Sequence, residues 1–366
     1  MKKVLGKRSS RINLYTYLLV TVAFIILQTM LSNGQLNSTT KGFLVPACAY
    51  IVLAVSLNLL VGVCGELSLG HAGFMGIGTF VGIVVSGAMA TKVSDPALRL
   101  VAAMAVGGVV AGIVGAVIGI PVLRLRGDYL AIVTLAFGEI LKNIIGNLYV
   151  GSDVNGFHFS IGSTAPVLAE GGKMFLSGPG GAKGVEKIST FFAGYLLIMF
   201  TLFVVLNLIN SKEGRAIRAV RDNRIAAESV GINVTAFRMK AFVVSAALAG
   251  MAGALFGLNY STTTASQFSF NTSINILVFV VLGGMGNILG SVISATVLYI
   301  LPEAMRKWGL QDYRMLLYAV VLIAVMLFTW SPKIKMAMQV AVAKLKSLLN
   351  KKAASANTKE EVGSDE

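Results

Sequence analysis

Three polar side chains, Glu66, Ser68 and His71, interrupt an apolar stretch that reads VGVCGELSLGHAGFMG. An ionisable group deep in a bilayer costs roughly 2.5–3.5 kcal/mol on insertion scales, so it must face a partner, a cavity or the interface. Glu66 can therefore gate or line a polar pathway, or it can be structural and cap the start of a half-helix. A lone histidine such as His71 is more often a core residue with satisfied hydrogen bonds than a ligand.

A second polar group lies in TLAFGEILKNIIGN, residues 134–147. Helical spacing places Glu139, Lys142 and Asn143 on one half of a helix, with Glu139 about 16 Å from the helix start at ~1.5 Å per residue. Glu139 and Lys142, three residues apart, can neutralise each other as a structural pair, or Glu139 can line a translocation path. The same two interpretations, a structural contact or a wall of the translocation path, apply less strongly to Asn58 and Asn275.

The chain offers no catalytic or metal-binding constellation, and we expect no enzyme activity, metal or cofactor. Cys48 and Cys64 lie in apolar segments and belong to no C-x-x-C pair or His/Cys cluster. The segment GPGGAKG, 178–184, lacks the spacing of a phosphate-binding loop. The net charge of +15 comes from basic residues at the ends of apolar runs, which favours a membrane topology signal over nucleic-acid binding.

These polar residues are embedded in a chain that is 55% hydrophobic and 13% charged over 366 residues. Apolar runs of membrane-spanning length predict an all-α polytopic membrane protein with about ten spans, some of them broken or re-entrant. The basic segment 1–13 precedes them, and we interpret the first apolar run as a retained anchor rather than a cleaved signal. The expected spans are 14–32, 43–63, 68–90, 98–120, 128–148, 191–210, 241–260, 272–284, 287–301 and 313–330.

The distribution of Lys and Arg orients these spans. With a cytoplasmic N-terminus, the inner segments hold 21 basic residues and the outer ones eight. Both termini are then cytoplasmic, which requires an even number of spans and favours splitting 272–301 at GGMGN into two short elements. Residues 14–330 form the transmembrane domain, with a large outer loop at 149–190, a cytoplasmic loop at 211–240, and a basic segment with a disordered acidic tail at 331–366.

The pattern G-x-G-x-x-x-G occurs twice, at Gly76–Gly82 and at Gly284–Gly290. Small residues at this spacing ordinarily indicate close helix packing. A second interpretation is that Gly76, Gly284 and Gly286 mark paired broken spans of an internal inverted repeat around a midplane pathway. A half-helix N-terminus near Gly76 or Gly284 could then offer backbone N–H groups to a substrate carboxylate.

The cytoplasmic loop contains an amphipathic segment, residues 213–231, which we expect to be one helix ending at Gly231. Its small apolar stripe comprises Ala216, Ala219, Val220, Ala226, Ala227 and Val230, and the spacing pairs Arg218 with Asp222 and Arg224 with Glu228. Such a helix can lie on an anionic membrane surface. However, its stripe holds no Trp, Phe or Leu, so a groove on a partner protein suits it better.

Four blocks together closely resemble the permease subunits of branched-chain amino acid ABC importers, of the LivM type. They are LNLLVGVCGELSLGHAGFMGIG, GDYLAIVTLAFGEILKN, EGRAIRAVRDNRIAAESVGIN followed by AFVVSAALAGMAGAL, and VFVVLGGMGNILGSVISA, within residues 43–330. The resemblance implies that the segment from Ala226 to Gly231 corresponds to the EAA-like loop that docks on the ATPase. The match is imperfect, because this chain has A-A-E with two residues before Gly231 and no later I-x-L-P.

The resemblance implies an importer subunit in the bacterial inner membrane. Its expected partners are a second, LivH-like permease, two cytoplasmic ATP-binding subunits and an extracytoplasmic substrate-binding protein, and its cargo is a branched-chain amino acid. The expected coupling residues are Glu213, Arg215, Arg218, Arg221, Ala226, Ala227, Glu228 and Gly231, and the path or gate residues are Asn58, Glu66, Ser68, His71, Gly76, Glu139, Asn143, Gly284 and Gly286. The alternatives are a permease of the same family for urea or another small polar solute, and a self-contained channel or ion-coupled transporter.

Overall fold

The computed structural model describes residues 2–34, 38–90, 92–125, 127–153, 156–162, 166 and 172–306, and isolated positions 313, 316, 319, 320 and 323. Met1–Lys307 form one compact unit and Trp308–Glu366 a second. The tenth expected span, 313–330, is described only at those isolated positions, and 331–366 lies outside the described residues.

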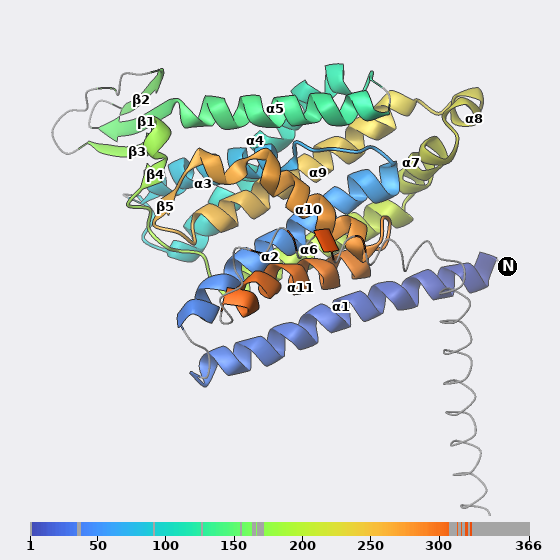
Figure 1. The fold of residues 1–366 in the computed structure, drawn as a ribbon, viewed down its shortest axis with the longest axis horizontal. Coiled ribbons are helices and arrows are strands. Elements are labelled where there is room, and N and C mark those ends of the chain that lie inside the picture. Colours follow the sequence, from blue (N-terminus) through green and yellow to red (C-terminus); the bar gives the residue numbers. More distant parts are fainter. Residues whose placement is uncertain are drawn as a thin grey trace, which may run out of the picture. The chain divides into compact units, whose positions relative to one another are not determined.

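The first unit is mainly helical (Figure 1). Its helices are α1 (Lys2–Ser32), α2 (Ser38–Asn58), the π-helix η1 (Leu59–Cys64), α3 (His71–Met89), α4 (Pro96–Val122), α5 (Asp128–Gly146), α6 (Phe191–Asn210), α7 (Lys212–Asp222), α8 (Arg224–Ser229), α9 (Val234–Gly257), α10 (Phe270–Gly283) and α11 (Ile288–Arg306), with short 3-10 turns η2 (Gly178–Gly180) and η3 (Ala265–Phe268).

The helices confirm the prediction of a polytopic, mainly α-helical protein. Seven membrane-length apolar helices occur in the described part of the chain, and α10 and the 288–301 part of α11 are shorter apolar helices. They correspond to the first nine expected spans. One boundary was wrong: α9 begins at Val234, so the end of the expected 211–240 loop is already helical.

Hydrophobic helices differ greatly in how far the rest of the protein buries them. The span that combines α2 and η1 is 89% buried, whereas the span in α1 is only 11% buried. The central helix α2 contacts α9, α11, α6 and α10. A helix that is apolar all round is expected either in a protein core or against lipid, and both cases occur here.

Small residues allow α3, α4 and α9 to approach closely. A Cβ added at Gly78 would overlap the carbonyl group of Gly250, and one at Gly250 would overlap the side chain of Ala111. Gly76, Gly78 and Gly82 thus lie inside the unbroken helix α3, which confirms the helix-packing interpretation of this copy of the motif. Helix α3 begins five residues before Gly76, at His71, so Gly76 lies within the helix. A pathway role for Gly76 stays a prediction.

Two of the non-helical segments contain predicted site residues. Residues 65–70 separate η1 from α3, and Gly65 has φ +79°. Residues 284–287 separate α10 from α11, and Gly284 and Gly286 have φ +89° and +85°. Glycine adopts this left-handed geometry without a steric penalty. The split of 272–301 into two elements is therefore confirmed, whereas the inverted repeat stays a prediction.

The loop at 149–190 contains strands that the sequence analysis did not predict. Strands β1 (Leu148–Asp153), β2 (Gly156–Ile161) and β3 (Lys173–Ser177) form an antiparallel sheet in the order β2-β1-β3. A second pair joins β4 (Ala182–Lys183) to β5 (Thr262–Thr263). Figure 1 shows this sheet at one end of the helical unit and α7, α8 and the start of α1 at the opposite end.

Candidate functional site

The segment between α6 and α9 forms two helices rather than one. Ser211 caps α7 by accepting a hydrogen bond from Gly214 N (3.1 Å), and Asn223 caps α8 by accepting one from Ala226 N (3.0 Å). Asn223 has extended backbone angles, φ −155° and ψ 106°. The prediction of one continuous helix over 213–231 was therefore wrong, because Asn223 forms a helix cap there instead of continuing the turn. Gly231, φ +81°, follows the end of α8 as predicted.

The apolar residues of this segment face two ways. Val220 and Ala227 are buried with Val234 in a small cluster, and Ile232 packs against it. By contrast, Ile225 and Val230 are 77% and 74% exposed, and Ala226 is exposed beside them. The predicted single stripe was wrong in this respect, because it combined buried and exposed residues. We call the exposed set, Ile225, Ala226 and Val230, the α8 surface.

Sequence reasoning missed Ile225. A signal for it existed, because positions 225 and 227 lie about 200° apart on a helical wheel at ~3.6 residues per turn. If Ala227 faces inward, Ile225 must therefore face outward. A large apolar residue in this position is unusual in a charged segment, and it is what a protein-docking helix would present.

Of the two charged pairs expected here, one forms and the other does not. Arg224 pairs with Glu228 at 2.9 Å, as predicted. Asp222 instead pairs with Arg221 at 2.9 Å, because Arg218 donates to the carbonyl oxygens of Ile209 (3.0 Å) and Gly214 (3.3 Å). The predicted Arg218–Asp222 pair was therefore wrong.

Other contacts attach the start of α7 to its neighbours. Arg215 donates to the carbonyl of Asn210 at 3.3 Å. Glu213 forms an ion pair with Lys240 of α9. The segment α7–α8 is thus tied to the end of α6 and to α9 by named polar contacts.

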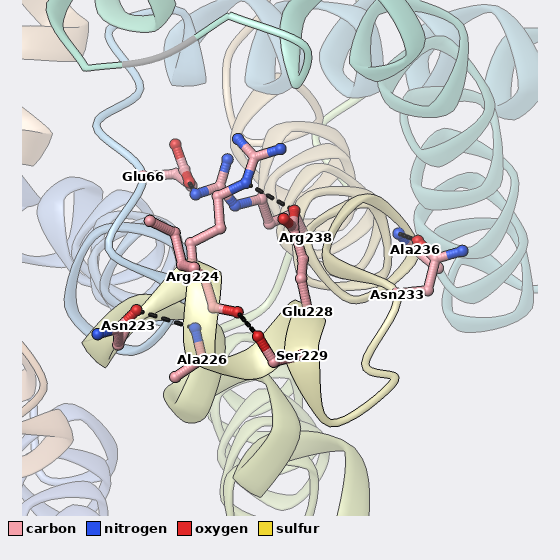
Figure 2. Close-up of polar contacts among 10 residues, drawn as sticks. Glu66, Asn223, Arg224, Ala226, Glu228, Ser229, Asn233, Ala236 and Arg238 are labelled. Atoms are coloured by element: carbon pink, nitrogen blue, oxygen red, sulfur yellow. Dashed lines mark hydrogen bonds and ion pairs between the residues drawn. The ribbon is translucent and has the colours of Figure 1, made fainter.

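Glu66 lies in the first helix break and faces Arg238 of α9. Their carboxylate oxygen and guanidinium nitrogen are 2.8 Å apart, and their side chains are only 9% and 13% exposed. Burial raises the pKa of Glu66, and the positive charges of Arg238 and then Arg224 partly lower it. Figure 2 shows Glu66 and Arg238 next to the Arg224–Glu228 pair of α8. The break and α8 therefore share one electrostatic environment.

Arg221 makes a second link between α7 and this break. Its Nη1 donates to the carbonyl oxygen of Gly62 in η1 at 2.7 Å. Gly65 lies against the same side chain, since a Cβ added there would be 2.5 Å from Arg221 Cγ. A larger residue at position 65 would displace Arg221.

The two helix breaks meet through Asn58. Its Oδ1 accepts from Gly286 N at 2.7 Å, and its Nδ2 donates to Asn287 O (3.1 Å) and Ser291 Oγ (2.7 Å). Contacts thus run from α7 through Gly62 and Asn58 to Gly286. The structure brings together Arg221, Glu66, Asn58 and Gly286, which come from three separate stretches of the sequence, and Gly284 begins the same turn.

The remaining predicted residues in and beside the first break, Ser68 and His71, are both buried. His71 is buried, and its Nε2 lies 2.8 Å from Ser56 Oγ. This agrees with the expectation of a core histidine. Ser68 is also buried, and its hydroxyl has no hydrogen-bond partner within the described residues.

Glu139 faces another helix terminus. Its Oε1 accepts from Phe270 N, the first residue of α10, at 2.9 Å, and it forms an ion pair with Lys142. A carboxylate at a helix N-terminus is favourable. These contacts support the structural interpretation of Glu139, and the neighbouring Asn143 has an exposed side chain. Within the part of the chain that the structure describes, no group of His, Cys, Asp and Glu side chains could hold a metal ion.

Comparison with known proteins supports a transport role for this arrangement. Residues 39–326 match the family model described as branched-chain amino acid transport system / permease component. The chain is 33% identical over 328 residues to the high-affinity branched-chain amino acid transport system permease protein LivM of Salmonella typhimurium, covering 87% of this chain and 73% of that relative. The Escherichia coli LivM is 32% identical over 332 residues, covering 86% and 74%.

A second group of relatives is more distant. The permease protein LivH of Salmonella typhimurium is 25% identical over 312 residues, covering 82% of this chain and 92% of that relative. No solved structure gave a significant match.

Proposed function

Because the chain belongs to the branched-chain amino acid transport system permease family, we propose that it forms half of the translocation pathway of an ATP-driven amino acid importer. The observation that carries this proposal is the family match over residues 39–326. A LivH-like permease is the proposed other half, since the LivH relative is similar in sequence to this chain over 312 residues. The proposed location is a bacterial inner membrane with both termini in the cytoplasm.

The energy for transport is proposed to come from two separate ATP-binding subunits. The α8 surface supports this, because Ile225 and Val230 are large apolar side chains exposed on α8. Helix α8 lies at the end of the unit that also carries α7 and the start of α1 (Figure 1). The exposed patch is small and narrow. It therefore suits a groove on an ATPase. Binding to a lipid surface would need a wider apolar face.

The contacts of α7 and α8 suggest how motion would spread. When the ATP-binding subunits close, they would displace α8, and Arg221 would carry the displacement to Gly62. The Glu66–Arg238 pair would couple the first break to α9, and Asn58 would pass the movement to the second break at Gly286. The backbone at such breaks is not helical, so it can rearrange without breaking the hydrogen bonds of a whole helix. The bundle would thereby change from inward-open to outward-open.

The opposite end is the proposed docking place for a substrate-binding protein. Strand β2 is at the edge of its sheet and exposes Phe157, Phe159 and Ile161 at alternate positions. Exposed apolar side chains on one face of an edge strand are typical of an interaction surface. Selectivity would then reside partly in the binding protein and partly in this chain.

The test is reconstitution of the complete importer in liposomes. We expect ATP-dependent accumulation of leucine, isoleucine or valine that requires the binding protein and the second permease. An ATPase variant that binds but does not hydrolyse ATP serves as the control, and urea uptake in parallel tests the cargo. Accumulation of solute by this chain alone, without nucleotide or other subunits, would overturn the proposal and favour a secondary transporter.

A further inference from the structure

A cavity of about 270 Å³ lies at the end of the unit that carries the strands. It is formed by the second half of α3, the first turn of α4, strands β3 and β4, and residues 184–186. None of the predicted coupling or pathway residues lines it. The side chains that matter for its chemistry are Ser86, Arg99, Lys173, Lys183 and Glu186.

Arg99 is the central polar group of this cavity and is only 5% exposed. Its Nη2 donates to Glu186 Oε2 at 2.7 Å and to Ser86 Oγ at 3.3 Å. Its Nε is buried and has no hydrogen-bond partner within the described residues. A guanidinium binds a carboxylate best through two parallel N–H groups, so the Nε–Nη2 edge is a site with one of its two bonds unmade.

Glu186 occupies this edge only partly. One of its oxygens contacts Arg99, and its side chain is 62% exposed. Because three cationic side chains and one anionic side chain line the cavity, its charge favours an anionic group. A ligand carboxylate can therefore take the Nε–Nη2 edge of Arg99. Glu186 then rotates away from Arg99 but still lines the cavity.

The remaining walls are apolar. Ile83, Met174, Phe175, Val185 and Leu258 line the cavity beside Arg99. Pockets of this kind, with apolar walls and a few polar groups, bind small organic ligands and orient them. An aliphatic side chain fits these walls.

We propose that this cavity binds an aliphatic α-amino acid, with Arg99 holding the carboxylate and Glu186 the ammonium group. The identification of the ligand as an amino acid rests on the proposed function, whereas the carboxylate preference rests on the cavity alone. The site would receive substrate at the strand-bearing end before it enters the pathway. An anionic lipid headgroup is the other source of a suitable oxyanion, and the test separates the two.

The experiment uses the full chain in nanodiscs of zwitterionic lipid and measures binding of leucine, 4-methylpentanoate and 3-methylbutylamine. We expect leucine and 4-methylpentanoate to bind, and the amine, which lacks the carboxylate, not to bind. Arg99→Gln should raise the Kd of leucine and of 4-methylpentanoate by at least about tenfold, as expected for loss of a buried charged partner. Glu186→Gln should weaken leucine and leave 4-methylpentanoate unchanged or tighter. Lys187→Gln is the matched control, because it removes an exposed positive charge outside the cavity.

Two further variants keep the test decisive if Arg99→Gln fails to fold. Ala90→Trp, at the exposed rim of the cavity, should block both ligands without touching the Arg99–Glu186 pair. Leucine binding that survives Ala90→Trp and Glu186→Gln would overturn the proposal. So would the absence of leucine binding together with a phosphatidylglycerol response that Arg99→Gln abolishes. ATP-driven uptake by the wild-type importer is measured separately, so that the proposed function can stand if this site fails.

Discussion

Glu66 and Arg238 form a nearly buried ion pair beside the first helix break. Burial costs the Glu66 carboxylate more than the positive charge of Arg238 returns, since the pKa of Glu66 is raised despite that charge. The pair therefore fixes which side chains meet at the break, without adding net stability in its ionised form. At the residue scale, this explains why a carboxylate lies between two apolar segments: its partner comes from a helix that is far away in the sequence.

Replacement of Glu66 by Gln should change how stability depends on pH. Burial raises the pKa of Glu66 above its usual 4.5 in the folded chain. Protonation of Glu66 thus contributes stability that is fully present below the unfolded pKa and is lost as the pH rises through the folded pKa. We expect the Tm of the wild type, measured in detergent from about pH 4 to about pH 7, to fall relative to that of Glu66→Gln. Parallel Tm curves would contradict this, and Glu228→Gln is the control for loss of an exposed carboxylate.

At the scale of elements, the Asn223 break determines which side chains α8 presents. In one continuous helix, the turn of α7 would fix the directions in which Ile225, Ala227 and Val230 point. The break instead lets Ala227 join the cluster of Val220 and Val234 and leaves Ile225 and Val230 in the open. Buried and exposed apolar residues thereby acquire different roles within one short segment.

Ile225→Asp should therefore weaken binding of the ATP-binding subunits without unfolding this chain. Ile225 is 77% exposed, so the substitution removes few contacts within the chain. We expect less ATPase to co-purify and less substrate-stimulated ATP hydrolysis, with an unchanged Tm. Ile161→Asp, at a similarly exposed residue on the opposite end, should retain the ATPase. Equal recovery of ATPase with both variants would refute docking at the α8 surface.

The interface of α3 with α9 makes a separate prediction about stability. A Cβ at Gly78 would overlap the Gly250 carbonyl, whereas one at Gly42, in α2, would meet nothing within 4 Å. Gly78→Ala should lower the free energy of unfolding by about 1–3 kcal/mol, the usual cost of overpacking. Gly42→Ala should be neutral or slightly stabilising, since alanine favours helix more than glycine does. Thermal unfolding of both variants in detergent measures the difference, and equal Tm values would show that the interface can relax.

At the scale of the whole molecule, the first unit has two chemically different ends. One carries the antiparallel sheet, and the other carries α7, α8 and the start of α1 (Figure 1). The excess of Lys and Arg in the segments predicted to be inside predicts that the second end faces the cytoplasm. This orientation is required by the proposed coupling to cytoplasmic ATP-binding subunits.

Cysteine labelling tests this orientation directly. The native Cys48 and Cys64 are buried, so the parent chain should react little with a membrane-impermeant maleimide. Phe159→Cys, in β2, should be labelled in intact spheroplasts, and Ala226→Cys, on the α8 surface, should be labelled only after permeabilisation. Labelling of Ala226→Cys from outside would reverse the topology and remove the basis for ATPase docking there.

The amino-acid sequence by itself determined the class of the protein, the nine spans that can be compared with described helices, and the split near Gly284. Long apolar runs, glycine spacing and basic flanks are local signals that do not depend on the partners of each helix. The Arg224–Glu228 pair could be predicted for the same reason, because its members lie on one helical turn.

Only the tertiary structure decided which hydrophobic helix is central, which charges meet, and where the strands form. Helices α1 and α2 are both apolar, yet 11% of one span and 89% of the other are buried, because burial depends on neighbours that composition does not specify. Glu66 meets Arg238, Asn58 meets Gly286, and Arg99 meets Glu186 across separations of 87 residues or more. Such contacts follow from the packing of whole helices, and no local pattern encodes them.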